Sequence, residues 1–500
     1  MSRPLARSSG GCWTCRIRHR KCDESSPACK ECADRHIQCH GYGPEPDWVK
    51  DPAKLHAELH RIKHAVKQNF RQTRKRQAAH SPRKTLNASG GSSETASLSI
   101  PAADSELREA ELLMYYLDYI FPLQYAYYVD KPATGGRGWL FWLLSKRGPL
   151  RHAAFTLSAL HQHSSSRNKT EEMESELIRY HTNAMQELRH VLGHCETDGF
   201  TRHPEHRVEF LTCGTFLISF EVFQGGTSKW KPHLNALLSV ASQVDAENIA
   251  GLSSQSPRPE MGFQRMITAA MRFQMAQLLW FDLVSCVATG VKPKLPYQHW
   301  LKLDEPDLSS VMGCQNWAML ALGDVASLES ELGETDLATL TGRTSAISSR
   351  LDEGIRYLDE RQHSHQLKTP SLCQSVTRVY ATTVLSQLRA FSATPETFAN
   401  EVGESIAEVI RSLQNVPDWV SLRGVTWPLA VAGSLARPDQ QPYFEGLLEK
   451  ILDTSGTGFT NCGTVLHILR ESWEHQNPKG HDINPARSAM RRLGISALLV

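Results

Sequence analysis

The sequence lacks a continuous apolar run that approaches the roughly 18 residues of a membrane-spanning helix. Its first eleven residues also lack the hydrophobic stretch that a secretory signal needs. Both absences argue against an integral membrane protein and against a secreted one. In a chain without an export signal, the 12 cysteines are expected to be reduced thiols that bind metal, because disulfide frameworks form in oxidising compartments.

The sequence also lacks the common motifs of nucleotide-binding and metal-dependent enzymes. It contains no G-x-x-x-x-G-K-[ST] loop, no G-x-G-x-x-G that opens a βαβ unit and no H-E-x-x-H helix. The chain is therefore predicted not to be an enzyme, although an enzyme fused to a metal-binding module stays open as an alternative. A length of 500 residues exceeds the usual domain of about 100–200 residues, so several domains or one large domain are expected.

Charge is distributed unevenly along the chain, although the overall net charge is only +2. Residues 1–85 carry 19 Lys and Arg against 8 Asp and Glu, whereas residues 86–500 carry 36 against 45. A basic N-terminal region joined to an acidic body predicts that the basic region binds a polyanion and that the body has another role.

This basic region contains six cysteines in a stretch of 28 residues: Cys12, Cys15, Cys22, Cys29, Cys32 and Cys39. Their spacing, C-x2-C-x6-C, occurs twice with an offset of 17 residues. A structural zinc ion takes four ligands in a tetrahedron. Two zinc ions need eight ligand positions, and six thiolates fill them if two thiolates bridge both metals. We therefore predict a centre of two zinc ions held by these six cysteines.

The cysteines are compatible with three other interpretations. The spacing could arise by chance in a fold without metal, or the segment could hold two independent sites of mixed ligation that use His19, His36 or His40. An iron–sulfur cluster is disfavoured because its ligands are spaced differently and usually number four cysteines.

This segment resembles the DNA-binding domain of the fungal binuclear zinc cluster transcription factors. The resemblance covers every metal position and includes Pro27, in the loop before the fourth cysteine. It implies that the first and fourth cysteines, Cys12 and Cys29, are the thiolates that bridge the two metals. We place this domain at residues 10–42.

The stretch between the second and third cysteines is strongly basic and reads Arg16, Ile17, Arg18, His19, Arg20 and Lys21. A short helix fixed by metal can enter the major groove, where Arg or Lys donates to O6 and N7 of guanine. The resemblance implies recognition of a CGG triplet, with the main base contact four residues after the second cysteine. That position is His19 rather than the usual Lys or Arg, so Arg18 or Arg20 is expected to share the role. A phosphate contact is the alternative for each arginine.

Residues 43–77 are predicted to form a linker followed by a basic amphipathic helix. Apolar residues recur at helical spacing from Leu55 to Phe70, which fits a short coiled coil that makes a homodimer or a helix packed on another domain or on DNA. Its basic end is interpreted as a nuclear localisation signal or as phosphate contacts; it comprises Arg71, Arg74, Lys75 and Arg76. Residues 78–105 are rich in Ser, Ala, Thr and Gly, which predicts a disordered, flexible linker.

Residues 106–500 are predicted to form a mostly α-helical domain. Leu112, Tyr116 and Ile120 form one apolar stripe, and residues 210–223, 263–291, 376–391 and 398–413 follow the same spacing. The scattered cysteines of this region are expected to be small core residues, and aromatics such as Trp280, Phe281 and Trp317 are expected in the core rather than around a ligand.

Several short patterns in this body resemble a fungal-specific transcription factor regulatory domain. They are Phe220–Gly225, Trp230 with His233-Leu234, Phe281-Asp282 before Ala288-Thr289-Gly290, Met312-Gly313-Cys314, and Trp427–Gly433 with Trp473. The resemblance implies an all-α array of helices that serves regulation through activation, partner contact or effector sensing.

Together these features predict a nuclear, zinc-dependent, sequence-specific DNA-binding regulator of RNA polymerase II transcription in a fungus. Control of one pathway or biosynthetic gene cluster is the expected scope. The expected partners are double-stranded DNA, the transcription machinery or co-regulators, and a second copy if the helix at residues 50–77 dimerises; no membrane is expected. The alternative is a ligand-gated sensor whose helical body binds a sterol or another metabolite.

Overall fold

The structure is a computed structural model in which the chain forms two units, Met1–Ser97 and Leu98–Val500. It describes residues 11–18, 22–33, 37–44, 46, 49, 54, 58, 61–62, 100–130, 136–198, 204–227, 229–245, 261–303, 306–332, 336–364, 371–394, 396–418, 420–455, 459–476 and 482–500. Each unit is described by itself.

The described part of the first unit includes α1 (Trp13–Ile17) and α2 (Lys30–Ala33), short helices that pack on each other. Its buried core consists of thiols: Cys12, Cys15, Cys22, Cys29 and Cys32, with Ile37 and Cys39 packed against them. The predicted helix of residues 50–77 falls largely outside the described residues, as does most of the linker predicted at 78–105.

The second unit is an all-helical body, and its described residues contain no strand. Its elements are α5 (Ile100–Tyr115), the π-helix η1 (Tyr116–Ile120), α6 (Phe121–Gln124), α7 (Gly138–Ser145), α8 (Pro149–Ser165), α9 (Glu171–Asp198), α10 (Pro204–Phe223), α11 (Trp230–Ala241), α13 (Met261–Thr289), α14 (Tyr297–Lys302), α15 (Ser309–Met312), α16 (Asn316–Ser330), α17 (Leu337–Ser364), α18 (Leu372–Ser392), α19 (Phe398–Gln414), the 3-10 turn η3 (Leu422–Gly424), α20 (Thr426–Leu435), α21 (Gln441–Ser455), α22 (Cys462–Glu474) and α23 (Pro485–Arg492). The mostly α-helical fold predicted from the sequence is confirmed.

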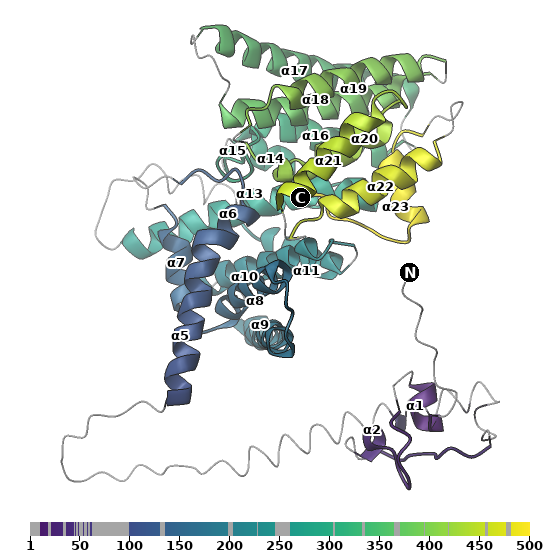
Figure 1. Ribbon diagram of the computed structural model, residues 1–500. Helices are drawn as coiled ribbons and strands as arrows, with labels where there is room; N and C mark the ends of the chain where they lie inside the picture. The colour runs from purple at the N-terminus through teal and green to yellow at the C-terminus, as the bar shows by residue number, and fades with distance from the viewer. Residues whose placement is uncertain are drawn as a thin grey trace. The chain divides into compact units, whose positions relative to one another are not determined.

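Helix α13 is the central element of this body (Figure 1). It packs against α7, α10 and α11 of the N-terminal helices and against α16 and α23 of the C-terminal ones. From Phe273 to Val287, residues on all sides of α13 are buried, including Met275, Leu279 and Val284, as expected for a helix enclosed by others. One continuous apolar core therefore extends from Tyr116 to Leu499.

Some of the other helices bury a single face, as their sequence spacing predicts, and α19 shows this most clearly. In α19 the buried residues Val402, Ile406, Val409 and Leu413 follow steps of four, three and four. Helix α18 begins with a capping box, in which the Ser371 side chain accepts from the N–H of Gln374 and the Gln374 side chain accepts from the N–H of Ser371.

The predicted stripe of Leu112, Tyr116 and Ile120 is fully buried. It continues from α5 into the π-helix η1, which ends just before Pro122 in the first turn of α6. Proline has no N–H to donate, so it interrupts the regular hydrogen-bond ladder at this point. Helix α5 begins at Ile100, inside the range predicted as linker, with Pro101 in its first turn, a position that favours helix initiation.

None of the described helices combines the length and the apolar content that a bilayer-spanning segment requires.

Two glycines in the left-handed region allow the tight packing of the body to be tested. Gly313 has φ +76°, and an added Cβ would lie 2.8 Å from Cβ of Tyr127. Gly494 has φ +66°, but nothing lies within 4 Å of its added Cβ. We expect Gly494→Ala to destabilise the body by about 1 kcal/mol through backbone strain alone. Gly313→Ala should cost about 1–3 kcal/mol more, because Tyr127 must also move.

The measurement is the urea dependence of far-ultraviolet circular dichroism for both variants and the unmodified chain. Equal unfolding midpoints for the two variants would contradict the close contact between Gly313 and Tyr127.

Candidate metal centre and nucleic-acid interface

Four of the predicted ligands form a compact group: Cys12, Cys15, Cys29 and Cys32 have Sγ atoms within 4.8 Å of one another. Sγ of Cys12 lies 3.7 Å from Sγ of Cys29 and 3.8 Å from Sγ of Cys32. Sγ of Cys15 is also 3.7 Å from Sγ of Cys29. Thiolates about 2.3 Å from a tetrahedral zinc ion are separated by about 3.8 Å, whereas a disulfide requires about 2.05 Å. The spacing of the thiols fits zinc.

The two remaining cysteines lie beside the same group. The Cys22 and Cys39 thiols interact with the thiol of Cys29, and Cys39 also interacts with Cys12. All six are free thiols, and all but Cys39 are buried. Cys12 and Cys29 are thus the thiols most enclosed by others, which is the arrangement that bridging ligands require.

The chemistry of this donor set also suits a cation. Burial raises the pKa of the Cys12 and Cys32 thiols and raises the pKa of Cys15 to about 12. Without a cation these buried thiols therefore keep their protons near neutral pH. Zinc binds thiolates and displaces those protons, so metal binding and folding of the segment are coupled.

The polypeptide around the cluster holds the thiols in place. The Cys12 thiol caps α1 by accepting from the backbone N–H of Cys15 at 3.4 Å. The Asp23 carboxylate lies close to Cys22 and Cys29, but it accepts the backbone N–H of Lys30 at 2.8 Å and the Ser25 hydroxyl at 2.7 Å. Asp23 therefore stabilises the loop before α2 through these hydrogen bonds.

His40, one of the histidines considered as an alternative ligand, has other partners. Its Nδ1 lies 2.9 Å from the Thr14 hydroxyl oxygen, and its Nε2 lies 3.4 Å from a carboxylate oxygen of Glu58. The Thr14 hydroxyl also donates to the carbonyl of Gln38 at 2.9 Å. His19 and His36 lie outside the described residues.

The structure places two of the predicted DNA-binding residues, and their surroundings differ. Arg16 is exposed on α1, and its guanidinium lies 4.6 Å from the ring centroid of Trp13. The indole N–H of Trp13 donates to the carbonyl of Gly43 at 2.9 Å, which fixes the ring. Arg18 instead lies 3.6 Å from the Glu31 carboxylate, with a side chain only 11% exposed.

The other predicted contacts lie outside the described residues: His19, Arg20, Lys21, Arg71, Arg74, Lys75 and Arg76. Sequence reasoning missed the roles of Trp13 and Glu31. The signal for Trp13 was present, because an aromatic residue three positions before an arginine shares its face on a helix. The ion pair of Arg18 with Glu31 joins the two halves of the repeat. Because the two residues are far apart in the sequence, no local pattern predicts the pair.

Comparison with protein families identifies both units. Residues 10–48 match the fungal Zn(2)-Cys(6) binuclear cluster domain, and residues 111–500 match the fungal specific transcription factor domain. The chain belongs to the fungal zinc cluster transcription factors. Its cofactors are accordingly two zinc ions, and the family resemblances stated from the sequence are confirmed.

Similar proteins in several fungi are named as regulators of transcription. The chain is 29% identical to the pestheic acid cluster transcriptional regulator 3 of Pestalotiopsis fici, over 95% of each chain. It is 28% identical to a trichothecene biosynthesis transcription regulator of Trichoderma arundinaceum, over 73% of this chain and 92% of that one. It is 22% identical to the ustiloxin B cluster transcription factor of Aspergillus flavus, over 99% of each. No solved structure matches the chain.

These findings establish a zinc-dependent DNA-binding transcription factor as the function of the family to which the chain belongs. They do not favour the ligand-gated sensor that the sequence left as the alternative.

Replacing a central thiol tests the metal centre. We expect the zinc content of the full chain to fall from two ions to well below one in Cys29→Ser. The reason is that Cys29 lies against the other thiols and a serine hydroxyl is a poor zinc ligand. Cys373→Ser is the matched control, since Cys373 is a half-buried thiol in α18, and it should retain two zinc ions per chain. Zinc is measured by atomic emission after gel filtration. A Cys29→Ser chain that keeps two zinc ions would exclude this thiol as a ligand.

Proposed function

We propose that the chain regulates RNA polymerase II transcription of a biosynthetic gene cluster in a fungal nucleus by binding duplex DNA through residues 10–42. The observation that carries this proposal is a buried thiol cluster spaced for zinc beside an exposed, stacked arginine on α1. The names of the relatives, which refer to the pestheic acid cluster, to trichothecene biosynthesis and to the ustiloxin B cluster, support the assignment to a biosynthetic cluster. The mechanism is binding, without catalysis by the chain.

In this proposal the zinc ligands are the six cysteines Cys12, Cys15, Cys22, Cys29, Cys32 and Cys39, with Cys12 and Cys29 as the bridging thiolates. The enclosure of these two thiols by the others supports the bridging role. Because the first unit has a core of thiols and little else, zinc holds α1 in the orientation that DNA binding requires.

The basic residues divide into three roles. Arg16 is the exposed contact to a base edge, since its guanidinium lies over the ring of Trp13 and its side chain is exposed to solvent. Arg18 is a positioning residue, because its ion pair with Glu31 holds α1 against α2. His19, Arg20 and Lys21 complete the surface that faces a CGG-type triplet, and the basic run from Arg71 to Arg76 binds phosphates or directs nuclear import.

The segment after the zinc cluster supports the cluster within one chain. Ile62 is buried, Glu58 is paired with His40, and Arg61 donates to the Gln38 side chain at 3.1 Å. These contacts favour a helix packed on the cluster over a coiled coil with a second copy. Residues 106–500 then contact the transcription machinery or co-regulators.

Selection of bound duplexes from a random pool tests the proposal as a whole. The zinc-loaded full chain should enrich CGG-containing sites, and a zinc chelator should abolish the enrichment because the thiol cluster unfolds without metal. Sites with a single triplet would match the packed segment, whereas paired triplets at fixed spacing would show a dimer. Unselective binding that survives chelation would contradict zinc-dependent recognition.

Two arginine substitutions separate base contacts from phosphate contacts. Arg16→Ala should weaken binding to the selected site by about 1–3 kcal/mol and weaken binding to random duplex much less. Arg74→Ala should weaken all sequences evenly and reduce the slope of log affinity against log salt by about one. Fluorescence anisotropy across a salt series measures both effects. An even loss in the Arg16→Ala chain would reassign Arg16 to the phosphate backbone.

A further inference from the structure

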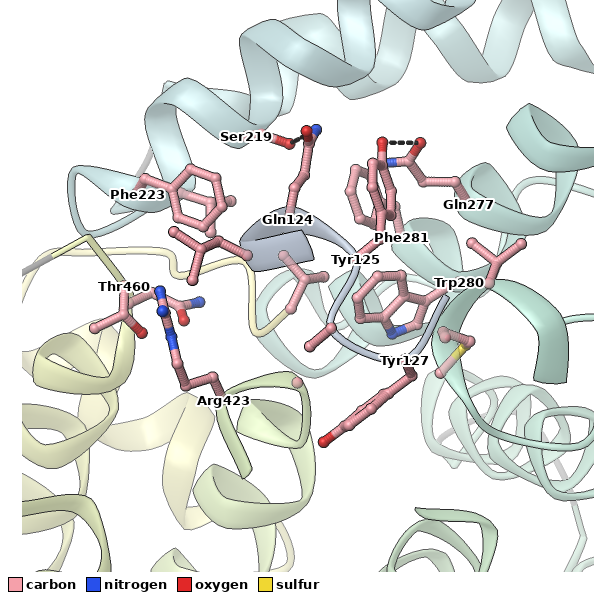
Figure 2. A pocket seen from close by; sticks show the side chains of 18 residues that line it. Gln124, Tyr125, Tyr127, Ser219, Phe223, Gln277, Trp280, Phe281, Arg423 and Thr460 are labelled. Carbon is pink, nitrogen blue, oxygen red and sulfur yellow. Dashed lines mark hydrogen bonds between the residues drawn. The ribbon is translucent and has the colours of Figure 1, made fainter. Parts of the chain in front are cut away.

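A cavity lies inside the helical body where seven segments of the chain meet (Figure 2). Its wall is formed by residues 123–127, by α10, α13 and α15, by Arg423 and Gly424 of η3, by Thr460 and Asn461, and by Val500. The cavity therefore lies between the N-terminal and C-terminal helices of this unit, and a molecule bound in it would touch both groups.

Most of the cavity wall is apolar and aromatic. Trp280 and Phe281 of α13 are buried, as the sequence predicted for core aromatics, yet both also face the cavity. Tyr125 has its hydroxyl occupied, because it donates to the Gln277 side chain at 3.0 Å. Phe223 stacks on Phe459 with ring centroids 3.9 Å apart. Such a wall excludes water and favours a ligand with an apolar body.

One positive charge stands in this apolar wall. Arg423 is half-buried, and Figure 2 shows its guanidinium on the side of the cavity where Phe223 and Thr460 lie. Its Nη2 donates to the carbonyl of Phe459, but its Nε is buried without a hydrogen-bond partner among the described residues. No carboxylate of the described residues, Val500 included, forms an ion pair with Arg423.

The surroundings of Arg423 do not offset its charge. Burial lowers the pKa of Arg423, although an arginine stays protonated in a protein. The nearest thiol, Cys462, has a pKa raised by burial and is therefore neutral. Burial also lowers the pKa of His161, and the charge of Arg423 lowers it further, so this histidine is neutral too. A half-buried cation without an ion pair is costly, and an anion that reaches it is correspondingly stabilised.

The Nε of Arg423 is the unsatisfied donor among the described residues of this wall. The indole N–H of Trp280 also belongs to a residue of the wall, but the Tyr380 hydroxyl lies beside it. Buried donors are almost always satisfied in folded proteins. The unsatisfied Nε of Arg423 therefore indicates a ligand that carries an acceptor.

We propose that this cavity binds a small organic monocarboxylate, with the carboxylate on Arg423 and a short aliphatic or aromatic body against Trp280 and Phe281. The cavity has a volume of about 50 Å³, several times the roughly 10–15 Å³ that a single water needs. A small monocarboxylate suits this space, whereas a sterol does not. The bound molecule would act on the regulatory body, and the role of the zinc cluster in binding DNA is unchanged.

The test compares benzoate with benzamide, a neutral molecule of nearly the same shape, on the zinc-loaded full chain without DNA. Isothermal titration calorimetry and thermal unfolding should show saturable binding of benzoate and at least ten-fold weaker binding of benzamide, because only the carboxylate complements Arg423. Acetate and butyrate serve as smaller carboxylate probes. Since no DNA is present, failure of this test and failure of the proposed DNA-binding function are distinguishable.

Arg423→Gln should weaken benzoate at least ten-fold and leave the weak affinity for benzamide nearly unchanged. Arg470→Gln is the matched control, since Arg470 is an exposed arginine of α22 paired with Glu445 and Glu449, and it should bind benzoate like the unmodified chain. If Arg423→Gln fails to fold, Arg423→Lys keeps the charge and should retain a preference for benzoate over benzamide.

Three results would overturn the proposal. The first is equal affinity of the unmodified chain for benzoate and benzamide. The second is undiminished benzoate binding by Arg423→Gln. The third is no saturable binding of any of the three carboxylates at about 10 mM, a concentration ten times a dissociation constant of about 1 mM.

Discussion

The bonding of thiolates to zinc is the interaction on which the DNA-binding unit depends. Its buried core contains cysteines where another small domain has leucines and isoleucines. So few apolar side chains cannot offset the conformational entropy that folding removes. Metal–ligand bonds supply this free energy instead. The same bonds fix α1, so the position of Arg16 over Trp13 follows from the metal centre as well as from the local sequence.

The helical body is stabilised by a different interaction. Its main apolar core includes α13, which is buried on all sides from Phe273 to Val287, and amphipathic helices such as α19 bury one face in this core. Hydrogen bonds between distant segments then fix how the helices meet. The Tyr127 hydroxyl donates to the carbonyl of Ser421 at 2.5 Å, and the indole N–H of Trp230 donates to the carbonyl of Ser496 at 2.8 Å. The two units therefore respond to different perturbations, since a chelator acts on the first and a change of core volume acts on the second.

Local patterns in the sequence predicted the parts of the structure that local physics determines. The spacing of the cysteines predicted the zinc cluster, and apolar periodicity predicted α10, α13, α18 and α19. Contacts between distant residues were not predictable in this way. The stripe of Leu112, Tyr116 and Ile120 looks the same whether the backbone is α-helical or contains a π-helix. The Arg18–Glu31 pair and the place of Arg423 in a cavity wall depend on how separate segments meet. A lone arginine in a short 3-10 turn gives no sequence signal of such a position.

The cavity draws its wall from seven separate stretches of the body, and none of them contributes a thiol to the zinc cluster. A substitution in any of these stretches alters the shape or polarity of the cavity while the residues that face DNA stay the same. The two properties can consequently diverge independently during evolution. Paralogues that arise by gene duplication could therefore recognise the same DNA site and bind different small molecules. A few changes in helices far apart in the sequence would suffice.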